Sequence, residues 1–396
     1  LKTIQLLGIP NQKDVDPSVE AVVIALKTRT IPVREAVGQS LQALSWLKAV
    51  GTERFFFKYC STFDSTDEGN IGPVIDAFMA DLEASFTIAC PAFPETGRTI
   101  FKGHLFVGDK LLSDSPMRNH PLTPMTDSNL VSILSRQSSL KVGLVQYQDV
   151  SGGAPKIKGA FNELKGGGVS IAVTDVLNDE HLHFLGEAVK EFKLITGGSG
   201  IALGLPYHWK SGNGSKEGMT ADQLPEVSGK ELVLSGSCSE MTRAQVDEFS
   251  KNNRALKLNP IELAKDTSAL NKAIDWVIKA EIGRPILVYA SAPPDTVKEI
   301  QQTLGQDLAS STVENAMAKI ASEAVKNGFR RIVVAGGETS GAVVSKLGIN
   351  SILIGKEIDP GVPATVSVGT PIISLVLKSG NFGSVDFFEK AFKQMP

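Results

Sequence analysis

The chain has 396 residues, of which 42% are hydrophobic and 21% charged, and its formal net charge is −3 at pH 7. This length favours two domains, and the nearly balanced charge argues against a nucleic-acid or membrane surface. The sequence holds no apolar run of about 18 residues, so no membrane-spanning helix is predicted. Three widely separated cysteines without a CxxC pair, and five histidines without metal-ligand spacing, predict a cytoplasmic protein with reduced thiols and no structural metal.

Short apolar runs alternate with amphipathic stretches in the first half of the chain. Strands are expected at residues 21–26, 55–59, 86–90, 142–147 and 170–174. Helices are expected at residues 33–48, 73–82, 129–137 and 179–192. Residues 101–112, with their Lys-Gly and Gly-Asp turns, predict an inserted hairpin. The alternation predicts an α/β domain built on a mostly parallel sheet flanked by helices.

A polar, glycine-rich stretch at residues 207–230 predicts a linker or a mobile loop between two domains, 1–206 and 231–396. The second domain repeats the alternation. Strands are expected at residues 231–234, 256–258, 285–290, 331–335 and 372–377. Helices are expected at residues 268–280, 312–327 and 342–347, and a fourth from Thr242. The spacings Thr242–Gln245 and Ser311–Glu314 predict capping boxes at two helix starts.

Residues 336–341 read Gly-Gly-Glu-Thr-Ser-Gly and lie between a buried strand and a helix. Glycines let backbone N–H groups approach an anion, and the helix dipole and two hydroxyl groups add attraction. The turn therefore predicts a phosphate or nucleotide site, although a tight turn with a Ser/Thr cap is the alternative. Two similar turns follow other strands, Ser-Gly-Ser at 235–237 and Lys-Ser-Gly-Asn-Phe-Gly at 378–383. Together the three turns predict one crevice.

Polar residues follow the predicted strands of the first half. Cations bind a carboxylate or a phosphate, hydroxyl and amide groups bind substrate hydroxyls, and an aspartate can accept a proton in phosphoryl transfer. This composition predicts a site for a small polyhydroxy acid, and solvated loop residues with helix caps are the alternative. The candidates are Lys27, Arg29, Lys58, Ser61, Asp64, Arg98 and His120.

Five separated motifs make the chain similar to the four-carbon acid sugar kinase family, and most of all to its oxo-tetronate branch. They are the segments 56–66 (FFKYCSTFDST), 103–109 (GHLFVGD), 117–125 (MRNHPLTPM), 334–341 (VAGGETSG) and 378–383 (KSGNFG). The resemblance covers residues 2–392 and implies a bilobal kinase. It implies ATP- and Mg²⁺-dependent phosphorylation of the C4 hydroxyl of a 3-oxo-tetronate, with domain closure excluding water.

The resemblance also assigns residues to the two ligands. It implies ATP contacts at Ser235, Gly337, Glu338, Thr339, Ser340 and Gly380. It implies sugar-acid contacts at Lys27, Arg29, Lys58, Ser61, Arg98 and His120. The family's opening Asp-Asp-Phe-Thr-Gly-Ala turn is expected before Leu1, and we take Asp64 as the substitute catalytic base.

Other functions remain open on the sequence. They include a threonate or erythronate kinase and a non-catalytic protein that binds a sugar acid or a nucleotide. An NAD-dependent oxidoreductase lacks support, because no GxGxxG precedes an acidic residue at the required distance. The expected partners are the sugar acid and ATP, without nucleic acid or membrane, and a homodimer is left open.

Overall fold

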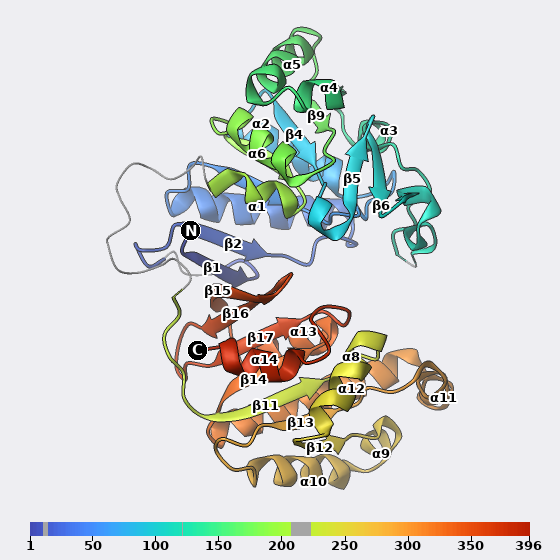
Figure 1. Ribbon diagram of the computed structural model, residues 1–396, viewed down its shortest axis with the longest axis vertical. Helices are drawn as coiled ribbons and strands as arrows, with labels where there is room; N and C mark the ends of the chain where they lie inside the picture. The colour runs from blue at the N-terminus through green and yellow to red at the C-terminus, as the bar shows by residue number, and fades with distance from the viewer. Residues whose placement is uncertain (11–14, 121, 207–222) are drawn as a thin grey trace. The chain divides into compact units, whose positions relative to one another are not determined.

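The computed structural model describes residues 1–10, 15–120, 122–206 and 223–396 and contains two compact units (Figure 1). The nine-stranded unit consists of Leu1–Leu7, Asp16–Ile24 and Lys216–Pro396, and the five-stranded unit of Gly8–Val15 and Ala25–Ser215. The predicted α/β class, with two domains and sheets rich in parallel strands, is confirmed. Residues 207–222 of the predicted linker lie outside the described residues.

The first two strands differ from the predicted division at residue 206. β1 (Thr3–Leu7) pairs antiparallel with β15 (Ser351–Asp359), with Ile4 opposite Leu353. β2 (Ala21–Ala25) lies beside β1 at the edge of the same sheet. These strands therefore belong to the nine-stranded unit. The sequence did not place them there, because an apolar run indicates a strand but not its partner.

The sheet of the nine-stranded unit has the order β12-β13-β11-β14-β17-β16-β15-β1-β2. The pairs from β12 to β17 are parallel, whereas β17, β16, β15 and β1 pair antiparallel. Its remaining strands are β11 (Lys230–Ser235), β12 (Arg254–Lys257), β13 (Ile286–Tyr289), β14 (Phe329–Ala335), β16 (Val362–Ser367) and β17 (Ser374–Lys378). Its helices are α8 (Glu240–Ser250), α9 (Pro260–Lys265), α10 (Thr267–Ile278), α11 (Pro294–Leu304), α12 (Gln306–Lys326), α13 (Gly337–Lys346) and α14 (Phe387–Gln394).

Helices cover both faces of this sheet. In β14, Ile332 and Val334 pack in one buried cluster with α12, while Val333 packs in another with Phe249 of α8 and Phe388 of α14. Successive strand residues face opposite sides, so a continuous apolar run buries both faces.

The helix α12 begins at Gln306, six residues before the predicted start, and Ser311 lies inside it. The predicted capping box Ser311–Glu314 is therefore wrong.

The five-stranded unit has a wholly parallel sheet of order β3-β10-β4-β9-β8 in the described residues. The strands are β3 (Phe55–Lys58), β4 (Thr87–Cys90), β8 (Val142–Val145), β9 (Ile171–Thr174) and β10 (Leu194–Gly197). The helices are α1 (Val33–Ala49), α2 (Ile71–Leu82), α3 (Leu130–Gln137), α4 (Tyr147–Val150), α5 (Ala154–Gly166) and α6 (Asp179–Ala188). The sequence missed β10, whose four residues are all buried and too few to show a period.

The predicted hairpin is part of a small antiparallel sheet of three strands. It consists of β5 (Arg98–Phe101), β6 (His104–Val107) and β7 (Lys110–Leu111). The sheet is held to the parallel one by the buried carboxylate of Asp175, which follows β9. This carboxylate accepts hydrogen bonds from the amides of Lys102 and Gly103, both at 2.9 Å. The turn between β5 and β6 is thereby fixed against the end of β9.

Candidate functional site

Three small-residue turns leave neighbouring parallel strands of the nine-stranded unit. They are residues 235–237 after β11, 336–341 after β14 and 378–383 after β17, and these three strands are adjacent in the sheet. Because the strands are parallel, their carboxyl ends lie at one edge, where open α/β sheets bind ligands. The sequence predicted that these turns converge, and their contacts bear this out.

Glycine is needed where the turns touch. A β-carbon on Gly236 would lie 2.1 Å from Thr339 Oγ1, and one on Gly380 would lie 2.4 Å from Ser237 Oγ. Gly336 has a φ of +121°, which side-chain-bearing residues rarely adopt. The turns after β11, β14 and β17 are therefore packed against one another as a single structure.

A network of hydroxyl groups joins the first turn to the third. The carbonyl oxygen of Gly380 accepts hydrogen bonds from Ser239 Oγ and Thr242 Oγ1, both at 2.7 Å. The ammonium group of Lys378 donates to Thr242 Oγ1 and to the same Gly380 oxygen, both at 3.1 Å. Gly380 was among the predicted ATP contacts, whereas Ser239, Thr242 and Lys378 were not. The prediction followed a glycine pattern, and these three side chains contact one another and Gly380 only in the folded protein.

The helix α13 begins inside the second turn with its amide groups available. Gly336 is its N-cap residue and no side chain caps it. The first N–H groups of a helix have no partner within the helix and carry its positive dipole end. Gly337 and Glu338 are exposed, and a β-carbon on Gly337 would meet nothing within 4 Å. An anion can therefore approach these amides, and the buried hydroxyl of Ser340, which has no partner among the described residues, lies in the same turn.

Ser235 occupies a different position from the other predicted ATP contacts. Its side chain is fully buried, and its hydroxyl lies 2.9 Å from Ser291 Oγ. Ser291 in turn donates to the carbonyl oxygen of Ser237 at 2.6 Å. The Ser235 hydroxyl therefore supports the first turn from within the protein.

The start of α8 corrects another prediction. The helix begins at Glu240 and is capped by Ser239, which accepts a hydrogen bond from the Thr242 amide at 3.2 Å. The fully buried Gln245 completes no capping box; its amide nitrogen donates to the carbonyls of residues 382–384 at 2.9–3.2 Å. The expected Thr242–Gln245 box is wrong, and Gln245 instead holds the third turn.

In the five-stranded unit, the predicted residues Arg29 and Asp64 meet. Arg29 Nη1 donates to Asp64 Oδ2 at 2.9 Å, and Thr62 Oγ1 donates to Asp64 Oδ1 at 2.5 Å. Asp64 is 5% exposed, whereas the side chain of Arg29 is 56% exposed. Phe63 and Asp64 both have positive φ, 64° and 43°, which is uncommon for such residues. The loop after β3 is thus bent so that the buried carboxylate orients an accessible guanidinium.

Asn70 fixes the loop that carries Arg29. Its side-chain nitrogen donates to the carbonyls of Thr28, Arg29 and Ile31 at 2.7, 3.3 and 2.9 Å. Asn70 stands at the start of α2 but makes no capping hydrogen bond. Three backbone carbonyls therefore depend on this one side chain, a role that its place before a helix did not reveal.

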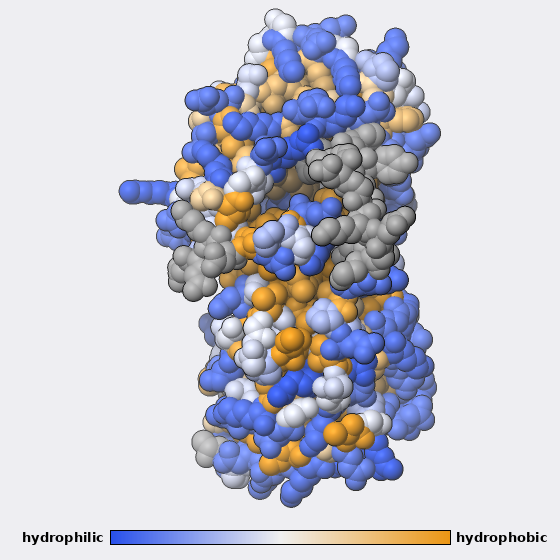
Figure 2. All heavy atoms as spheres, turned by 90° about the vertical axis from the view of Figure 1, so that its left-hand side faces the viewer, coloured by the Kyte–Doolittle hydropathy of each residue, from blue (hydrophilic) through white to orange (hydrophobic). Residues whose placement is uncertain are grey.

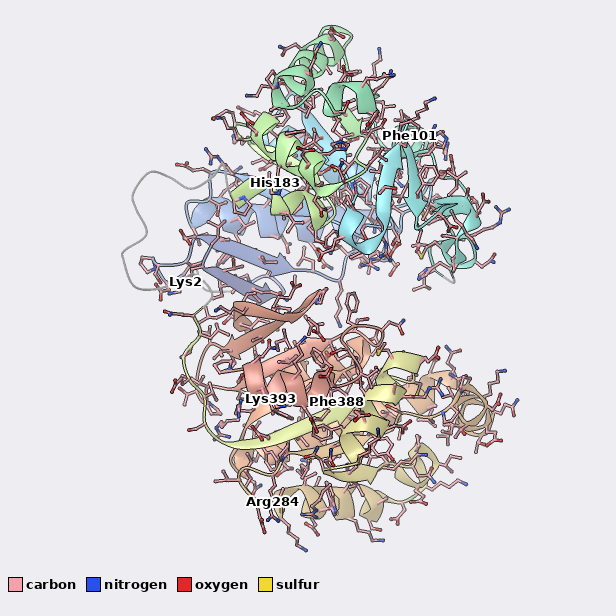
Figure 3. The ribbon with its side chains drawn as sticks, viewed as in Figure 1. Lys2, Phe101, His183, Arg284, Phe388 and Lys393 are labelled. Atoms are coloured by element: carbon pink, nitrogen blue, oxygen red, sulfur yellow. The ribbon has the colours of Figure 1, made fainter. Side chains whose placement is uncertain are left out.

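The other predicted sugar-acid ligands are spread over the unit. Lys27 and Lys58 are exposed, and Ser61 is half-buried in the loop after β3. Arg98 is the first residue of β5 and donates a hydrogen bond to the Thr96 carbonyl. Figure 3 labels Phe101, the last residue of this strand. Nδ1 of His120 accepts the Thr123 amide hydrogen at 3.1 Å. In the described residues, no hydrogen bond or ion pair joins Arg98 or His120 to Asp64 or Arg29.

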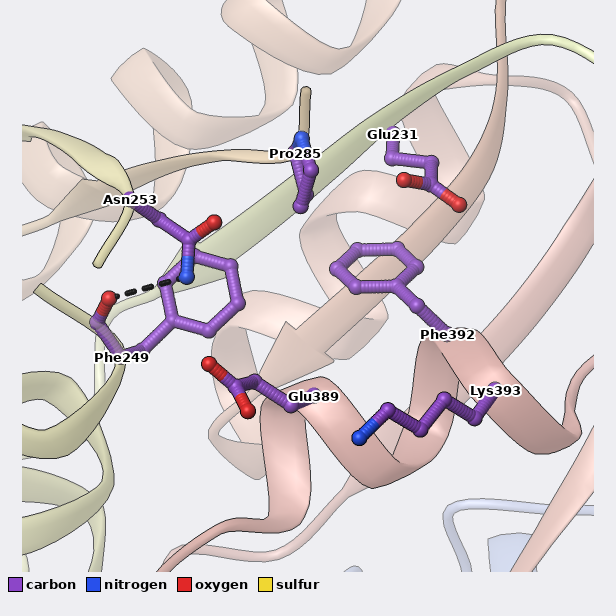
Figure 4. A pocket seen from close by; sticks show the side chains of 7 residues that line it. All are labelled: Glu231, Phe249, Asn253, Pro285, Glu389, Phe392 and Lys393. Carbon is purple, nitrogen blue, oxygen red and sulfur yellow. Dashed lines mark hydrogen bonds between the residues drawn. The ribbon is translucent and has the colours of Figure 1, made fainter. Parts of the chain in front are cut away.

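A pocket of about 300 Å³ lies at the other end of the nine-stranded unit's strands (Figure 4). The rings of Phe249 and Phe392 line it together with Glu231 at the start of β11 and Pro285 before β13. The three turns leave the opposite ends of these parallel strands. This cavity is therefore separate from the turns.

No group of three or more His, Cys, Asp or Glu side chains in the described part of the chain could hold a metal ion. Cys60, Cys90 and Cys238 are free thiols, as predicted. Burial raises the pKa of Cys90 to about 11.

No helix among the described residues is long and apolar enough to cross a membrane. Figure 2 shows hydrophilic side chains over much of the face it presents.

Two family models each match one half of this chain. Residues 1–205 match the family described as the sugar-binding N-terminal domain, and residues 232–388 match the nucleotide-binding C-terminal domain. All three turns lie within the second match.

Two relatives that match over the whole of this chain carry the same name. The chain is 49% identical to a 3-oxo-tetronate kinase of Burkholderia multivorans and to one of Pseudomonas savastanoi, covering 100% of this chain and 92% of each relative. A crystal structure of a Haemophilus influenzae protein superposes with a TM-score of 0.87 at 44% identity, covering 100% of this chain and 94% of that one. This chain therefore belongs to the four-carbon acid sugar kinase family, among the relatives named 3-oxo-tetronate kinase.

Proposed function

We propose that this protein transfers the γ-phosphoryl group of ATP to the C4 hydroxyl of a 3-oxo-tetronate. The observation that carries the proposal is the packing of three turns around one sheet edge, within the part matched as nucleotide-binding. Relatives that are 49% identical over the whole chain are named for this substrate. A binding site for an anion and an acid-binding loop are the two parts that such a reaction needs.

The phosphates of ATP bind at the first turn of α13. The amides of Gly337, Glu338 and Thr339 and the unpartnered hydroxyl of Ser340 supply donors there. Gly380 completes the site from the neighbouring turn, to which a β-carbon could not be added without a clash. Ser235 contributes by shaping the first turn, since its hydroxyl is engaged with Ser291.

Mg²⁺ enters the reaction with ATP. This ion needs only one or two protein carboxylates when phosphate oxygens and water complete its octahedron. Glu338 is an exposed carboxylate in the first turn of α13, and it would hold the ion beside the phosphates. The ion would neutralise charge that develops on the transferred group.

The sugar acid binds in the five-stranded unit. Arg29 pairs with the substrate carboxylate, and Lys27, Lys58, Ser61, Arg98 and His120 are further candidate contacts. Each oxygen of Asp64 keeps a free lone pair after its one hydrogen bond, so this carboxylate can orient the C4 hydroxyl and accept its proton. The C4 oxygen then forms a bond to the γ-phosphorus as the bond to the bridging oxygen of ADP breaks.

The test is a coupled ADP-release assay with the full-length protein, ATP–Mg²⁺ and a panel of 3-oxo-tetronates, threonate and erythronate. We expect turnover to be at least about tenfold faster with a 3-oxo-tetronate than with threonate or erythronate. The wrong acid would leave polar groups of the binding site without hydrogen-bond partners. Phosphorus NMR should place the phosphate ester on C4. Preference for threonate or erythronate would replace the proposed acceptor, and binding without turnover would support a non-catalytic binding protein.

Arg29→Gln tests the acid-binding loop. It should raise the KM for the sugar acid at least about tenfold, as expected for a lost charged hydrogen bond, and leave the KM for ATP unchanged. Arg34→Gln removes the same charge from an exposed position in α1 and serves as the matched control. Equal effects of the two substitutions would contradict a specific role of Arg29.

A further inference from the structure

Lys378 is a buried cation beneath the three turns. It is the last residue of β17, and only 1% of it is exposed. Lysine is almost never fully buried unless its charge is paired. In the described residues, no acidic side chain forms an ion pair with Lys378. A buried and unpaired ammonium group at the edge of a ligand site therefore calls for an explanation.

The contacts of Lys378 connect two of the turns. Its ammonium group has three protons, and its hydrogen bonds reach Thr242 Oγ1 and the Gly380 carbonyl. Thr242 Oγ1 also donates a hydrogen bond to the Gly380 carbonyl oxygen, and so does the Ser239 hydroxyl. Both of the acceptors are neutral. The network positions the third turn but leaves the positive charge uncompensated.

Burial is the only cause that lowers the pKa of Lys378, to about 8. The charged side chains in the first turns of the helices beside it are Glu240 and Arg243 of α8 and Glu338 of α13, and none of them contributes to this shift. Cys238, in the turn between β11 and α8, is a free thiol. An anion would favour the charged form of Lys378 and return its pKa toward the ordinary value of 10.5.

We propose that Lys378 is the buried counter-charge of the three turns and positions them for the phosphates of a nucleotide. The inference rests on the proposed function, because it takes that nucleotide as the ligand. Lys378 acts through Gly380 and Thr242 and through its own charge, in addition to the donors exposed at the start of α13. The free protein therefore carries a partly deprotonated lysine, and binding of the phosphates recharges it.

The experiment measures proton uptake on ligand binding. Titration calorimetry of the full-length protein with ADP, and with inorganic tripolyphosphate as a probe without a base, is done from pH 7 to 9.5. Each titration is repeated in two buffers of different ionisation enthalpy. Near pH 8, where the phosphates of ADP are already ionised, binding of ADP should take up about half a proton per site, because about half of the lysine is neutral before binding. Uptake should fall to about a tenth of a proton at pH 7, where most of the lysine is already charged.

Three variants identify the group. Lys378→Met should abolish the uptake and weaken ADP binding at least about tenfold, whereas Lys378→Arg should keep most of the affinity without uptake, because arginine does not titrate in this range. Cys238→Ser should take up as many protons as the unmodified protein. If Lys378→Met does not fold, Lys378→Arg and Cys238→Ser still decide the assignment.

The outcomes separate the inference from the proposed function. ADP binding without proton uptake, or with equal uptake in Lys378→Arg, would overturn the role of Lys378 and leave the nucleotide site intact. Failure of the unmodified protein to bind either ADP or tripolyphosphate would overturn the nucleotide site itself.

Discussion

Asn70 holds Thr28 by donating a hydrogen bond from its side-chain nitrogen to the Thr28 carbonyl at 2.7 Å. Two further bonds to the carbonyls of Arg29 and Ile31 fix the rest of that loop. Arg29 then reaches back to Asp64, in the loop that precedes Asn70. The two loops thus hold each other, and the guanidinium that we assign to the substrate carboxylate is set in place before substrate binds.

Asn70→Ala should therefore weaken sugar-acid binding as well as the fold. The substitution leaves three carbonyls without this donor, and we expect a loss of about 1–3 kcal/mol in the free energy of unfolding. The KM for the sugar acid should rise about 3- to 30-fold as Arg29 becomes less ordered, which corresponds to about 0.7–2 kcal/mol. Steady-state kinetics with each substrate varied in turn would measure this, and the KM for ATP should not change.

A matched asparagine provides the control. Asn178 caps α6 by accepting a hydrogen bond from the amide of His181 at 3.1 Å. Asn178→Ala should cost about 1 kcal/mol of stability, as cap removal usually does, without changing either KM. A similar rise in the KM for the sugar acid in both variants would mean that lost stability, and not loop position, causes the effect.

Gly337→Ala tests whether the open space at the start of α13 is the phosphate site. No atom lies within 4 Å of a β-carbon added there, so the fold should tolerate the methyl group. We expect the KM for ATP to rise at least about tenfold, because the methyl group would stand where phosphate oxygens approach the amides. Gly38→Ala in α1 also meets nothing within 4 Å and should stabilise the protein by about 0.5–1 kcal/mol. Equal KM values for ATP in the two variants would place the phosphates elsewhere.

Much of the fold follows from local patterns, while the supporting groups of the site do not. The apolar strand before Gly336 and the residues after it predicted a βα turn, and β14 and α13 confirm it. Lys378 appeared in the sequence only as the first letter of a glycine motif. Its role depends on Thr242, which is 136 residues away and comes into contact only when β11 and β17 flank β14.

Strand partners were equally hidden. β1 and β2 show the same apolar character as the strands of the five-stranded unit, yet β1 pairs with β15, about 350 residues later. The Asn70 and Gln245 side chains have ordinary positions near helix starts, where capping is the default expectation. Each instead satisfies three carbonyls of a distant loop. Such long-range polar contacts have no sequence period from which they could be predicted.

Gln245 should be required for the shape of the third turn. Its amide nitrogen is the donor to three carbonyls of residues 382–384, and it is fully buried. Gln245→Glu replaces this donor with a carboxylate that the carbonyls repel, and we expect it to destabilise the protein by about 2–4 kcal/mol. Gln245→Met keeps the length without the charge and should cost less. Thermal unfolding should show this order, and equal losses would indicate that packing alone matters at this position.

Asp359 holds Ser384, directly after the third turn, and makes the stability of the protein depend on pH. It accepts hydrogen bonds from the Ser384 amide at 2.8 Å and from the Ser384 hydroxyl at 3.1 Å, and it pairs with Lys390 of α14. Burial alone would raise the pKa of Asp359, but Lys390 and Ser384 together hold it below its ordinary value of 3.8. A carboxyl whose pKa is lower in the folded state stabilises the protein above the unfolded pKa. That stability is lost as the pH falls below 3.8 and through the folded pKa.

Asp359→Asn should remove this part of the acid sensitivity. At pH 7 the variant should be less stable by about 1–3 kcal/mol, the usual cost of losing charged hydrogen bonds. The difference from the unmodified protein should shrink between pH 5 and pH 2, because protonation of Asp359 breaks the same contacts in the unmodified protein. Urea unfolding at a series of pH values measures this difference directly. Since Ser384 follows the third turn, tripolyphosphate binding should weaken in Asp359→Asn at pH 7, and Asp275→Asn, at an exposed position in α10, should leave it unchanged. A difference in stability that stays constant down to pH 2 would show that Asp359 acts through packing and not through its charge.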